Sequence, residues 1–268
     1  MLQQLLEARL QLATSSSDED GGGGESFLDA EMNARVVRDA ESYYRAMYKG
    51  DSTAWNQRDR HMYSILARLL KLRPGSKAVV WAHNSHLGDA RGSSMGVRRG
   101  EVNLGQLCRE NFSSSSSGTR KGDEVCIIGC GTHTGTVAAA DEWDEPMQVM
   151  AVNPSRADSY ERVMHDVGLS SFLLVMRQGQ GQGQGQGQEG ISMGDTGMMD
   201  GDMEPRLQRF IGVIYRPDTE RYSHYIESIL NRQYDAFVFF DETEAVHPFE
   251  TAQPKEPLAR GETYPFGL

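Results

Sequence analysis

The sequence is poor in the features that mark secreted, membrane-bound and nucleic-acid-binding proteins. It has only three cysteines in 268 residues, Cys108, Cys126 and Cys130, and they cannot all pair with one another. We therefore expect buried thiols in a reducing compartment rather than a disulfide framework. No apolar run approaches membrane-spanning length, and the opening stretch, interrupted by Glu7 and Arg9, is no signal-peptide core. The formal net charge of −11 disfavours nucleic acid and anionic membranes as partners, so a soluble cytoplasmic protein is expected.

Several catalytic signatures are also missing. There is no G-x-S-x-G elbow, which leaves a serine nucleophile on an α/β-hydrolase scaffold unsupported. Cys108 and Cys130 lack a local cysteine-hydrolase signature. The glycine-rich segment Gly129–Gly135 misses the dinucleotide fingerprint by one position, and no Lys-Ser/Thr pair follows it. If the chain is a hydrolase, direct attack by water is the chemistry that remains.

Short apolar runs alternate along the chain with stretches of helical periodicity. Helices are predicted over residues 31–48, 56–71, 155–167 and 222–230, and strands over residues 78–82, 124–129, 148–152, 172–176, 210–215 and 234–240. This alternation indicates an α/β fold with a covered, mostly parallel or mixed sheet flanked by helices. Periodicity alone leaves the order of the strands open.

Low-complexity segments interrupt this pattern. Residues 1–30 are predicted to hold a short amphipathic helix (1–13) and a Ser/Asp/Gly linker, ahead of one α/β domain over residues 31–250. A serine run at 111–122 and a Gln/Gly-rich stretch at 178–204 interrupt the domain, and an irregular tail follows at 251–268. Because glycine at every second position raises the entropic cost of order, both interruptions are predicted to be disordered insertions.

A cluster of polar side chains follows the predicted buried strand at 78–82. His83, Asn84 and His86 come first, and open α/β folds place their sites at such strand ends. The two histidines permit three interpretations: a metal pair, satisfied buried side chains, or groups that orient water, donate to a carbonyl oxygen or protonate a leaving group. No third ligand is set by spacing, so we predict no metal.

Other charged residues near this cluster have two interpretations each. Arg98, Arg99 and Glu101 form either a polar rim or an ion-pair network beside the histidines. Asp89 or Glu101 can serve as a third metal ligand or hold an imidazole by a hydrogen bond. His133 lies in a predicted Gly/Thr-rich turn, GTHTG. Asp241 and Glu242 end the last predicted strand, where an acid either caps a helix or orients a histidine.

Arg58, Asp59 and Arg60 lie at the start of a predicted helix, in WNQRDRHM. On the sequence alone, Asp59 can favour the amino end of the helix, and both arginines can be surface charges. An arginine here can also stabilise the oxyanion that forms when water adds to an ester carbonyl.

Several of these segments together resemble the erythromycin esterase family. They are WAHNSHLGDAR, MGVRRGEVNLGQLCRE, WNQRDRHM, GTHTGTVAAADEWDEPM, NPSRADSYERVMHD and QYDAFVFFDETEAVHP. The resemblance spans residues 31–248 and implies a metal- and cofactor-independent ester hydrolase. It makes Arg58 the first choice for oxyanion stabiliser, with His83 and His86 as acid, base or carbonyl-polarising groups. Members of the family begin with a half that carries a Gly-Glu-x-x-His-Gly-type motif, which this sequence lacks, so we expect an incomplete domain.

Three functional hypotheses follow. The first is hydrolysis of a small-molecule carboxylic ester, including a macrolactone, with His83, His86 and Arg58 as catalytic groups. Around them, Arg60, Asp59, Asn84, Asp89, Arg98, Arg99, Glu101, His133 and Glu242 bind substrate or support the catalytic groups. The second is an incompetent half-domain that acts with a partner and self-associates through exposed sheet edges. The third is a phosphate-ligand binding module that uses the arginines and the GTHTG turn.

Overall fold

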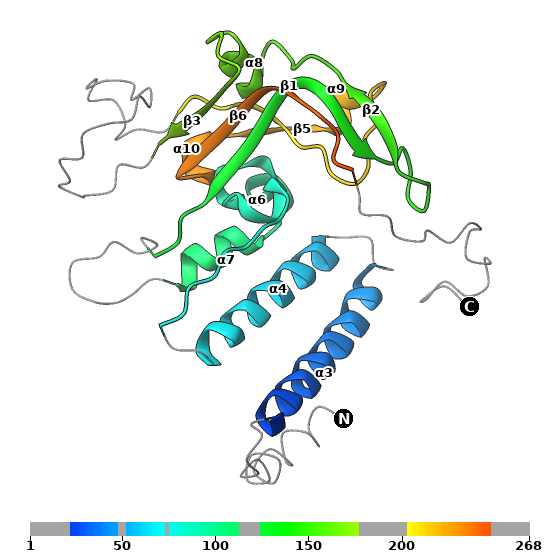
Figure 1. Cartoon of the computed structure of the whole chain (residues 1–268), viewed down its shortest axis with the longest axis vertical. Coiled ribbons are helices and arrows are strands. Elements are labelled where there is room, and N and C mark those ends of the chain that lie inside the picture. Colours follow the sequence, from blue (N-terminus) through cyan, green and yellow to red (C-terminus); the bar gives the residue numbers. More distant parts are fainter. Residues whose placement is uncertain (1–21, 48–51, 73–74, 113–123, 177–202, 248–268) are drawn as a thin grey trace, which may run out of the picture. The chain divides into compact units, whose positions relative to one another are not determined.

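A computed structural model describes residues 22–47, 52–72, 75–112, 124–176 and 203–247 (Figure 1). The chain divides into two compact units, Met1–Val79 and Val80–Leu268. The helix predicted at 1–13, the tail at 251–268 and nearly all of the two insertions lie outside the described residues. The linker predicted up to Glu25 ends earlier, because helix α3 already begins at Gly22.

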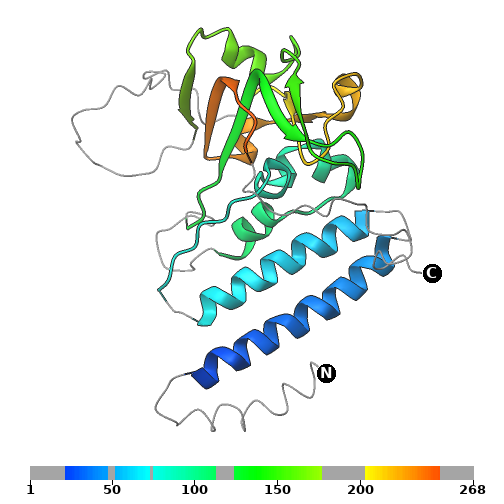
Figure 2. The ribbon, with the colours of Figure 1, turned by 45° about the vertical axis from the view of Figure 1, so that its right-hand side comes forward.

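The first unit is a pair of antiparallel helices, α3 (Gly22–Met47) and α4 (Ser52–Leu72), which lie side by side in Figures 1 and 2. Polar side-chain contacts join the two helices at intervals. Successively later residues of α4 contact successively earlier residues of α3, as expected for an antiparallel pair. The contacts are Gln57–Ser42 at 3.1 Å, His61–Asp39 at 2.7 Å and Arg68–Glu31 at 2.7 Å. The helices predicted at 31–48 and 56–71 are therefore confirmed, and charge-assisted hydrogen bonds join them.

The second unit contains a mixed four-stranded sheet in the order β2-β1-β6-β3. Its strands are β1 (Ile128–Ala139), β2 (Gln148–Val152), β3 (Ser171–Val175) and β6 (Ala236–Thr243). β1 and β6 run parallel, and the other two pairs are antiparallel. β4 (Arg206–Arg209) and β5 (Tyr225–Ser228) form a separate antiparallel ribbon. The mixed sheet flanked by helices confirms the predicted α/β class.

Short helices connect these strands. They are α5 (Asn84–Leu87), the 3₁₀ turn η2 (Ala90–Gly92), α6 (Ser94–Arg99), α7 (Leu104–Asn111), α8 (Tyr160–His165), α9 (Glu220–Ser223) and α10 (Leu230–Gln233). The helix predicted at 155–167 is shorter than expected, because α8 begins only after Ser159, whose side chain accepts from the Arg162 N–H. No helix in the described part of the chain is both long and apolar enough to span a membrane.

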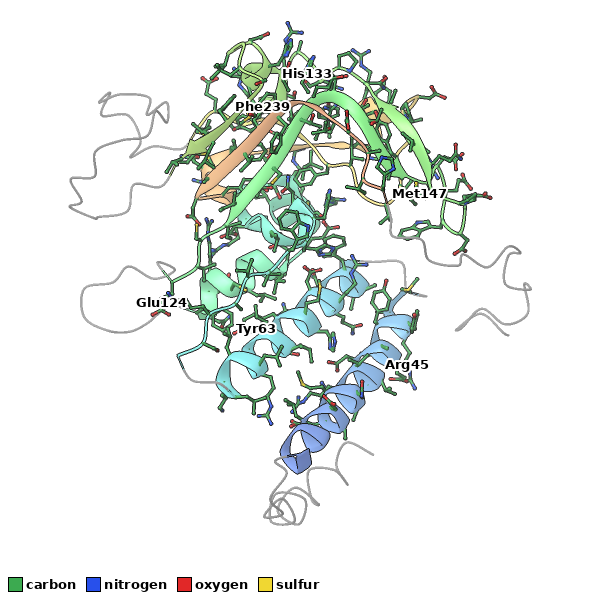
Figure 3. The ribbon with its side chains drawn as sticks, in the orientation of Figure 1. Arg45, Tyr63, Glu124, His133, Met147 and Phe239 are labelled. Carbon is green, nitrogen blue, oxygen red and sulfur yellow. The ribbon has the colours of Figure 1, made fainter. Side chains whose placement is uncertain are left out.

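The main core lies on one face of the sheet. Phe237 and Phe239 of β6 are fully buried there, and Phe239 is labelled in Figure 3. They pack with Tyr160 of α8, with Leu230 of α10 and with Tyr234. A smaller cluster (Ala139, Val152 and Tyr215) fills the space beside β2. Since side chains alternate along a strand, this packing fixes which residues of β1 and β6 face the helices.

Side chains form hydrogen bonds with the backbone groups of β1 along the part of its outer edge that β2 does not cover. Asn84 accepts from the Cys130 N–H at 3.2 Å and donates to the Cys130 carbonyl at 2.6 Å. Arg209, at the end of β4, donates to the carbonyls of Thr132 and His133. Two side chains thus take the place of a neighbouring strand along this edge.

The prediction of a buried strand at 78–82 is wrong. This run is extended but joins no sheet among the described residues, and Val79 and Trp81 are 95% and 93% exposed. An apolar run becomes a buried strand only where a second strand satisfies its backbone groups and other elements cover its faces. Nothing in the described part of the chain does this for residues 78–82.

The Gly/Thr-rich turn predicted around His133 is also wrong, because the segment is the middle of β1. The glycines serve packing there. A Cβ on Gly129 would approach Phe237 Cδ2 to 2.6 Å, and one on Gly131 would approach Phe237 Cε1 to 2.8 Å. Glycine at these positions lets the Phe237 ring lie flat against the strand.

Two further predictions fail around the β4–β5 ribbon. Residues 210–215 form no strand, and the strand lies earlier, at Arg206–Arg209. The helix predicted at 222–230 is replaced by α9 and β5, because Tyr225 and Ser228 pair with Arg209 and Arg206 across the ribbon.

Cys126, expected to be buried, is exposed, whereas Cys108 is buried as predicted.

Candidate functional site

The segment His83–Leu87, which we call the histidine loop, begins where the extended run 78–82 ends. His83 is the N-cap of α5: its Nδ1 accepts from the Ser85 N–H at 3.2 Å and lies 2.8 Å from Ser85 Oγ. Its ring packs edge-on against Phe210, with centroids 5.8 Å apart. Because Nδ1 accepts from a backbone N–H, the neutral ring carries its proton on Nε2.

Burial lowers the pKa of His83, and the nearby His86 ring lowers it further, while a hydrogen bond to the backbone of Ile211 acts in the opposite direction. At neutral pH His83 is therefore uncharged. Ser85 engages one ring nitrogen, and the Ile211 backbone accounts for the other. These contacts make His83 a group that shapes the loop.

Asn103 holds the histidine loop from the opposite side. It is 1% exposed, and its Nδ2 donates to the carbonyls of Ser85 (2.9 Å) and Gly88. Its Oδ1 accepts from the N–H groups of Gln106 (3.0 Å) and Ala90 (3.4 Å), which makes it the N-cap of α7. The sequence-based site did not include Asn103. The available signal was an asparagine directly before the amphipathic stretch LGQLCRE.

Asp89 lies in an ion-pair cluster beside this loop. Its carboxylate pairs with Arg91 at 2.6 Å and with Arg109 at 3.5 Å, and Arg109 also pairs with Asp235 at 3.0 Å. Asp235 in turn accepts from the Ile127 N–H just before β1. These ion pairs connect α7 and η2 to the starts of β1 and β6. Asp89 therefore stabilises the elements that follow the histidine loop.

Arg98 and Arg99 lie at the end of α6 and are largely exposed. Arg98 pairs with Glu227 of β5, and Arg99 pairs with Glu101 at 3.3 Å. Their side chains are 68% and 53% exposed, respectively. Both pairs lie at the surface, where exposed ion pairs add little stability.

Arg58, Asp59 and Arg60 belong to α4 in the first unit. The Arg58 guanidinium lies over the Trp55 ring, 4.9 Å from its centroid. Asp59 is fully buried, and Arg60 is exposed. Arg58 is therefore held in place by a cation–π contact within its own helix.

His133, labelled in Figure 3, faces the core from β1 and forms a stacked pair of imidazoles with His165 of α8. The two ring centroids are 3.7 Å apart and the planes 9° apart. Ser155 Oγ lies 2.6 Å from His133 Nδ1, and Asp241 Oδ1 lies 2.6 Å from His165 Nδ1. Sequence reasoning missed His165 and Ser155, but the alternative that an acid at the end of β6 orients a histidine holds for Asp241.

The pKa of His133 is lowered mainly by burial and next by the adjacent His165. Arg209 and Arg162 act in the same direction, and Asp241 opposes them. The ring is consequently neutral at physiological pH. It packs between β1 and α8.

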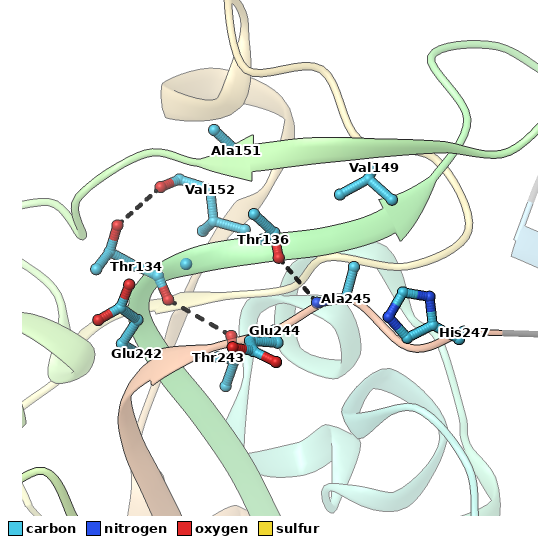
Figure 4. Close-up of a pocket in the computed structure, with 11 residues that line it drawn as sticks. Thr134, Thr136, Val149, Ala151, Val152, Glu242, Thr243, Glu244, Ala245 and His247 are labelled. Carbon is cyan, nitrogen blue, oxygen red and sulfur yellow. Dashed lines mark hydrogen bonds between the residues drawn. The ribbon is translucent and has the colours of Figure 1, made fainter.

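A pocket of about 470 Å³ opens at the carboxyl ends of the parallel strands β1 and β6 (Figure 4). Open α/β sheets bind ligands in this position. Its polar lining comes from side chains on both strands and the segment after β6, namely Thr134, Thr136, Glu242, Thr243, Glu244 and His247. Thr136 Oγ1 accepts from the Ala245 N–H at 2.8 Å, which holds that segment against β1. Of the predicted site residues, only Glu242 lines this pocket.

The structure thus places the predicted residues in separate neighbourhoods. His83, Asn84 and His86 share the histidine loop, His133 lies in the stacked pair, and Glu242 lies in the pocket. Within the described residues, no three His, Cys, Asp or Glu side chains are grouped so as to hold a metal ion.

Comparison with known proteins relates the chain to esterases. The family model for erythromycin esterase matches residues 1–243. A crystal structure of a Bacillus cereus protein matches with 16% identity and a TM-score of 0.58, covering 90% of this chain and 52% of that one. A succinoglycan biosynthesis protein matches with 16% identity and a TM-score of 0.55, covering 91% of this chain and 51% of that one. A variant of the erythromycin esterase EreC in its open conformation shows 17% identity and a TM-score of 0.47, with 89% of this chain and 51% of that one covered.

The chain therefore spans about half the length of the solved structures it matches. At this level of identity the structural matches establish the fold alone. The family model covers nearly the whole sequence, including the histidine loop, the segment around Arg58 and the last strand. On this match, the chain belongs to the erythromycin esterase family.

Proposed function

We propose that the chain takes part in the hydrolysis of a small-molecule carboxylic ester by direct attack of water. The observation that carries the proposal is the histidine loop, which is fixed on both sides inside a match to an esterase family. Asn84 anchors the loop to β1, and Asn103 clamps its backbone. A catalytic group needs such support, because a small misplacement of a reacting atom reduces the rate strongly.

We infer different roles for the two histidines. His83 is neutral and has its ring contacts within the unit, so it positions the loop. Proton transfer is assigned to His86: it takes one proton from the water as the water oxygen bonds to the carbonyl carbon. It returns that proton to the alkoxide when the ester C–O bond breaks, which yields the acid and the alcohol. The oxyanion-stabilising role predicted for Arg58, which belongs to the first unit, stays a separate prediction, and an R58K variant tests it.

The test is hydrolysis of aryl esters and a macrolide lactone by the purified chain. His86→Gln should lower kcat by about a hundredfold or more, because general acid–base groups contribute factors of about 10²–10⁴. His165→Gln is the matched control, since His165 pairs with Asp241 away from the histidine loop. A wild-type rate equal to that of buffer would eliminate the active-enzyme form of the proposal.

A half-domain that needs a partner is the second candidate. It is favoured by the missing Gly-Glu-x-x-His-Gly motif and by the match to only about half of each solved structure. Light scattering decides here, because a half-domain with bare apolar surface should associate. A clean, cooperatively melting monomer would count against it.

The phosphate-binding hypothesis loses its main structural support, because the Gly/Thr segment lies in β1 and forms no loop. A phosphate loop needs several backbone N–H groups pointing to one centre. Along β1 these groups are instead engaged by β6, by β2 and, at Cys130, by the Asn84 side chain. Sugar phosphates and nucleotides should therefore leave the melting temperature unchanged.

A further inference from the structure

One face of the four-stranded sheet is bare in the described structure. The register between strands defines nine positions on it, in three rows across β1, β6 and β3. The rows are Ile128–Ala236–Val175, Cys130–Val238–Leu173 and Thr132–Phe240–Ser171, and we call them the bare face. Residues opposite one another on paired strands project from the same side of a sheet, so these nine side chains share one surface.

The bare face is exposed although it is apolar. Six of the nine positions are exposed, among them Ile128, Leu173, Val175 and Phe240 at 48%, 51%, 59% and 43%. Ala236, on the central strand, is 8% exposed, and Thr132 and Val238 are half-buried. None of the nine positions carries a charge. Sheet surfaces and edges that face water normally carry lysine, glutamate or other polar residues, which keep them soluble. An uncharged face of this kind is typical of a contact surface.

The opposite face shows what a covered face of this sheet looks like. Phe237, Phe239, Phe172 and Leu174 project to that side and pack in the main core with α8 and α10. The sheet therefore has one side packed on helices and one side without a cover among the described residues.

The pocket of Figure 4 continues the bare face along β1 and β6. Thr134 and Thr136 follow Thr132 at alternate positions of β1, and Glu242 follows Phe240 on β6. All three line the pocket. A cover on the bare face would therefore approach the pocket from its apolar end.

The size of the bare face selects its occupant. Its outer Cα atoms span roughly 10 by 13 Å, from strands about 4.8 Å apart and rows two residues apart. This matches one α-helix about 10 Å across, with about nine residues at 1.5 Å each along the face.

We propose that the bare face docks the apolar side of an α-helix from a polypeptide that supplies the half of the esterase fold this chain does not span. This chain covers only 52% and 51% of two solved proteins that it matches, so each of those proteins contains additional polypeptide. The proposal rests on the half-domain form of the proposed function, and it adds the contact surface and its chemistry. The docked helix also closes the apolar end of the pocket that holds Glu242.

Cys130 provides a native reporter, because its exposed side chain lies in the middle row of the bare face. Cys126, also exposed but outside the nine positions, serves as the control. The probe is the half of the Bacillus cereus protein that this chain does not match, produced as a separate polypeptide. Thiol labelling uses a dithiobis-nitrobenzoate reagent. The Cys126→Ser variant reports the labelling rate of Cys130, and the Cys130→Ser variant reports that of Cys126.

With the probe at about ten times its dissociation constant, labelling of Cys130 should slow about tenfold, while that of Cys126 should not change. Leu173→Lys should abolish this protection, and Val213→Lys, at a position 67% exposed and outside the nine positions, should not. Val175→Lys repeats the test if circular dichroism shows that the Leu173 variant is misfolded.

Three results would overturn the proposal. The first is a Cys130 thiol that is already unreactive in the dilute chain, which means that the chain covers its own face. The second is protection that appears with rising concentration of the chain alone, which identifies a second copy as the occupant. The third is a labelling rate that the probe leaves unchanged or slows equally in Leu173→Lys. Because the readout is labelling, it is independent of whether the chain hydrolyses esters.

Discussion

Replacing Asn103 with alanine should destabilise the second unit strongly and release the histidine loop. The amide of Asn103 makes four hydrogen bonds, to Ser85, Gly88, Gln106 and Ala90, in a site that is 1% exposed. At about 1 kcal/mol for each of the three shorter hydrogen bonds, of which the one from Gln106 is the helix cap, and with nothing counted for the long bond from Ala90 (3.4 Å), the expected loss is about 3 kcal/mol. Alanine offers no replacement partner to the buried carbonyls it leaves behind.

Urea denaturation measures this loss. With an m-value of about 2 kcal/mol/M, a loss of 3 kcal/mol lowers the midpoint by about 1.5 M. Hydrogen exchange should show the increased opening concentrated in residues 83–103. Asn111→Ala is the matched control, because Asn111 ends the same helix and, among the described residues, its side chain donates to the Leu107 carbonyl within its own turn. Its effect should stay within about 0.5 kcal/mol.

Asn103→Asp separates the two halves of the amide's role. The carboxylate keeps the acceptor for the Gln106 N–H but turns negative charge toward the Ser85 and Gly88 carbonyls, so this variant should also be destabilised at neutral pH. Protonation at acid pH restores one donor and should recover part of the loss. If Asn103→Ala loses less than about 1 kcal/mol, or no more than Asn111→Ala, the clamp does not hold the loop.

Three further predictions concern other parts of the second unit. Folding lowers the pKa of His133 below its ordinary value of 6.5, so the unfolded chain binds the proton more readily and the free energy of unfolding should fall as pH drops below about 6.5. Melting curves between pH 7.5 and 5 measure this dependence. His133→Gln should flatten it, and an unchanged slope would contradict the prediction. A Cβ on Gly105 would lie 1.7 Å from the Leu87 carbonyl oxygen, so Gly105→Ala should lower the free energy of unfolding by about 3 kcal/mol or more. A Cβ on Gly212 would have nothing within 4 Å, so Gly212→Ala should be neutral. Equal melting temperatures of the two variants would refute the packing argument. Burial raises the pKa of Cys108 to about 11, so at pH 8 its thiol should be labelled far more slowly than that of Cys130, and comparable rates would disprove its burial.

Elements with a strong local pattern were predictable from the sequence. The helical stripes at 31–48 and 56–71 and the apolar runs at 148–152, 172–176 and 234–240 form the expected elements, although Val36, Leu69, Val149 and Leu173 within them are exposed. The run at 78–82 has an equally strong pattern but forms no strand. A strand depends on partners that the local sequence does not specify.

The ribbon β4–β5 shows the same limit from the other direction. Residues 222–230 carry a helical pattern, yet Tyr225 and Ser228 pair with β4, where the Tyr225 side chain is buried. Long-range pairing overrode the local preference, as it commonly does in short segments. The glycines of β1 were misinterpreted for a related reason, because their function depends on the Phe237 ring about a hundred residues later in the chain.

The contacts of the candidate site residues were not predictable from the sequence. The sequence placed a polar cluster after residue 82, and the structure anchors this loop through Asn84 to Cys130, 46 residues away. The stacking of His133 on His165 arises from the packing of α8 on β1, which no spacing rule encodes. Chemistry-bearing residues can be recognised locally, whereas their partners are fixed by topology.

The outer edge of β1 has a consequence for how this fold can change. Asn84 and Arg209 block the edge with an amide and a guanidinium, where backbone would otherwise extend the sheet. A single substitution at either residue would leave backbone groups open to a strand from elsewhere, which is a route to strand exchange or to the growth of a larger sheet. The boundary of the sheet is therefore a property of two side chains, and it can be gained or lost by point mutation.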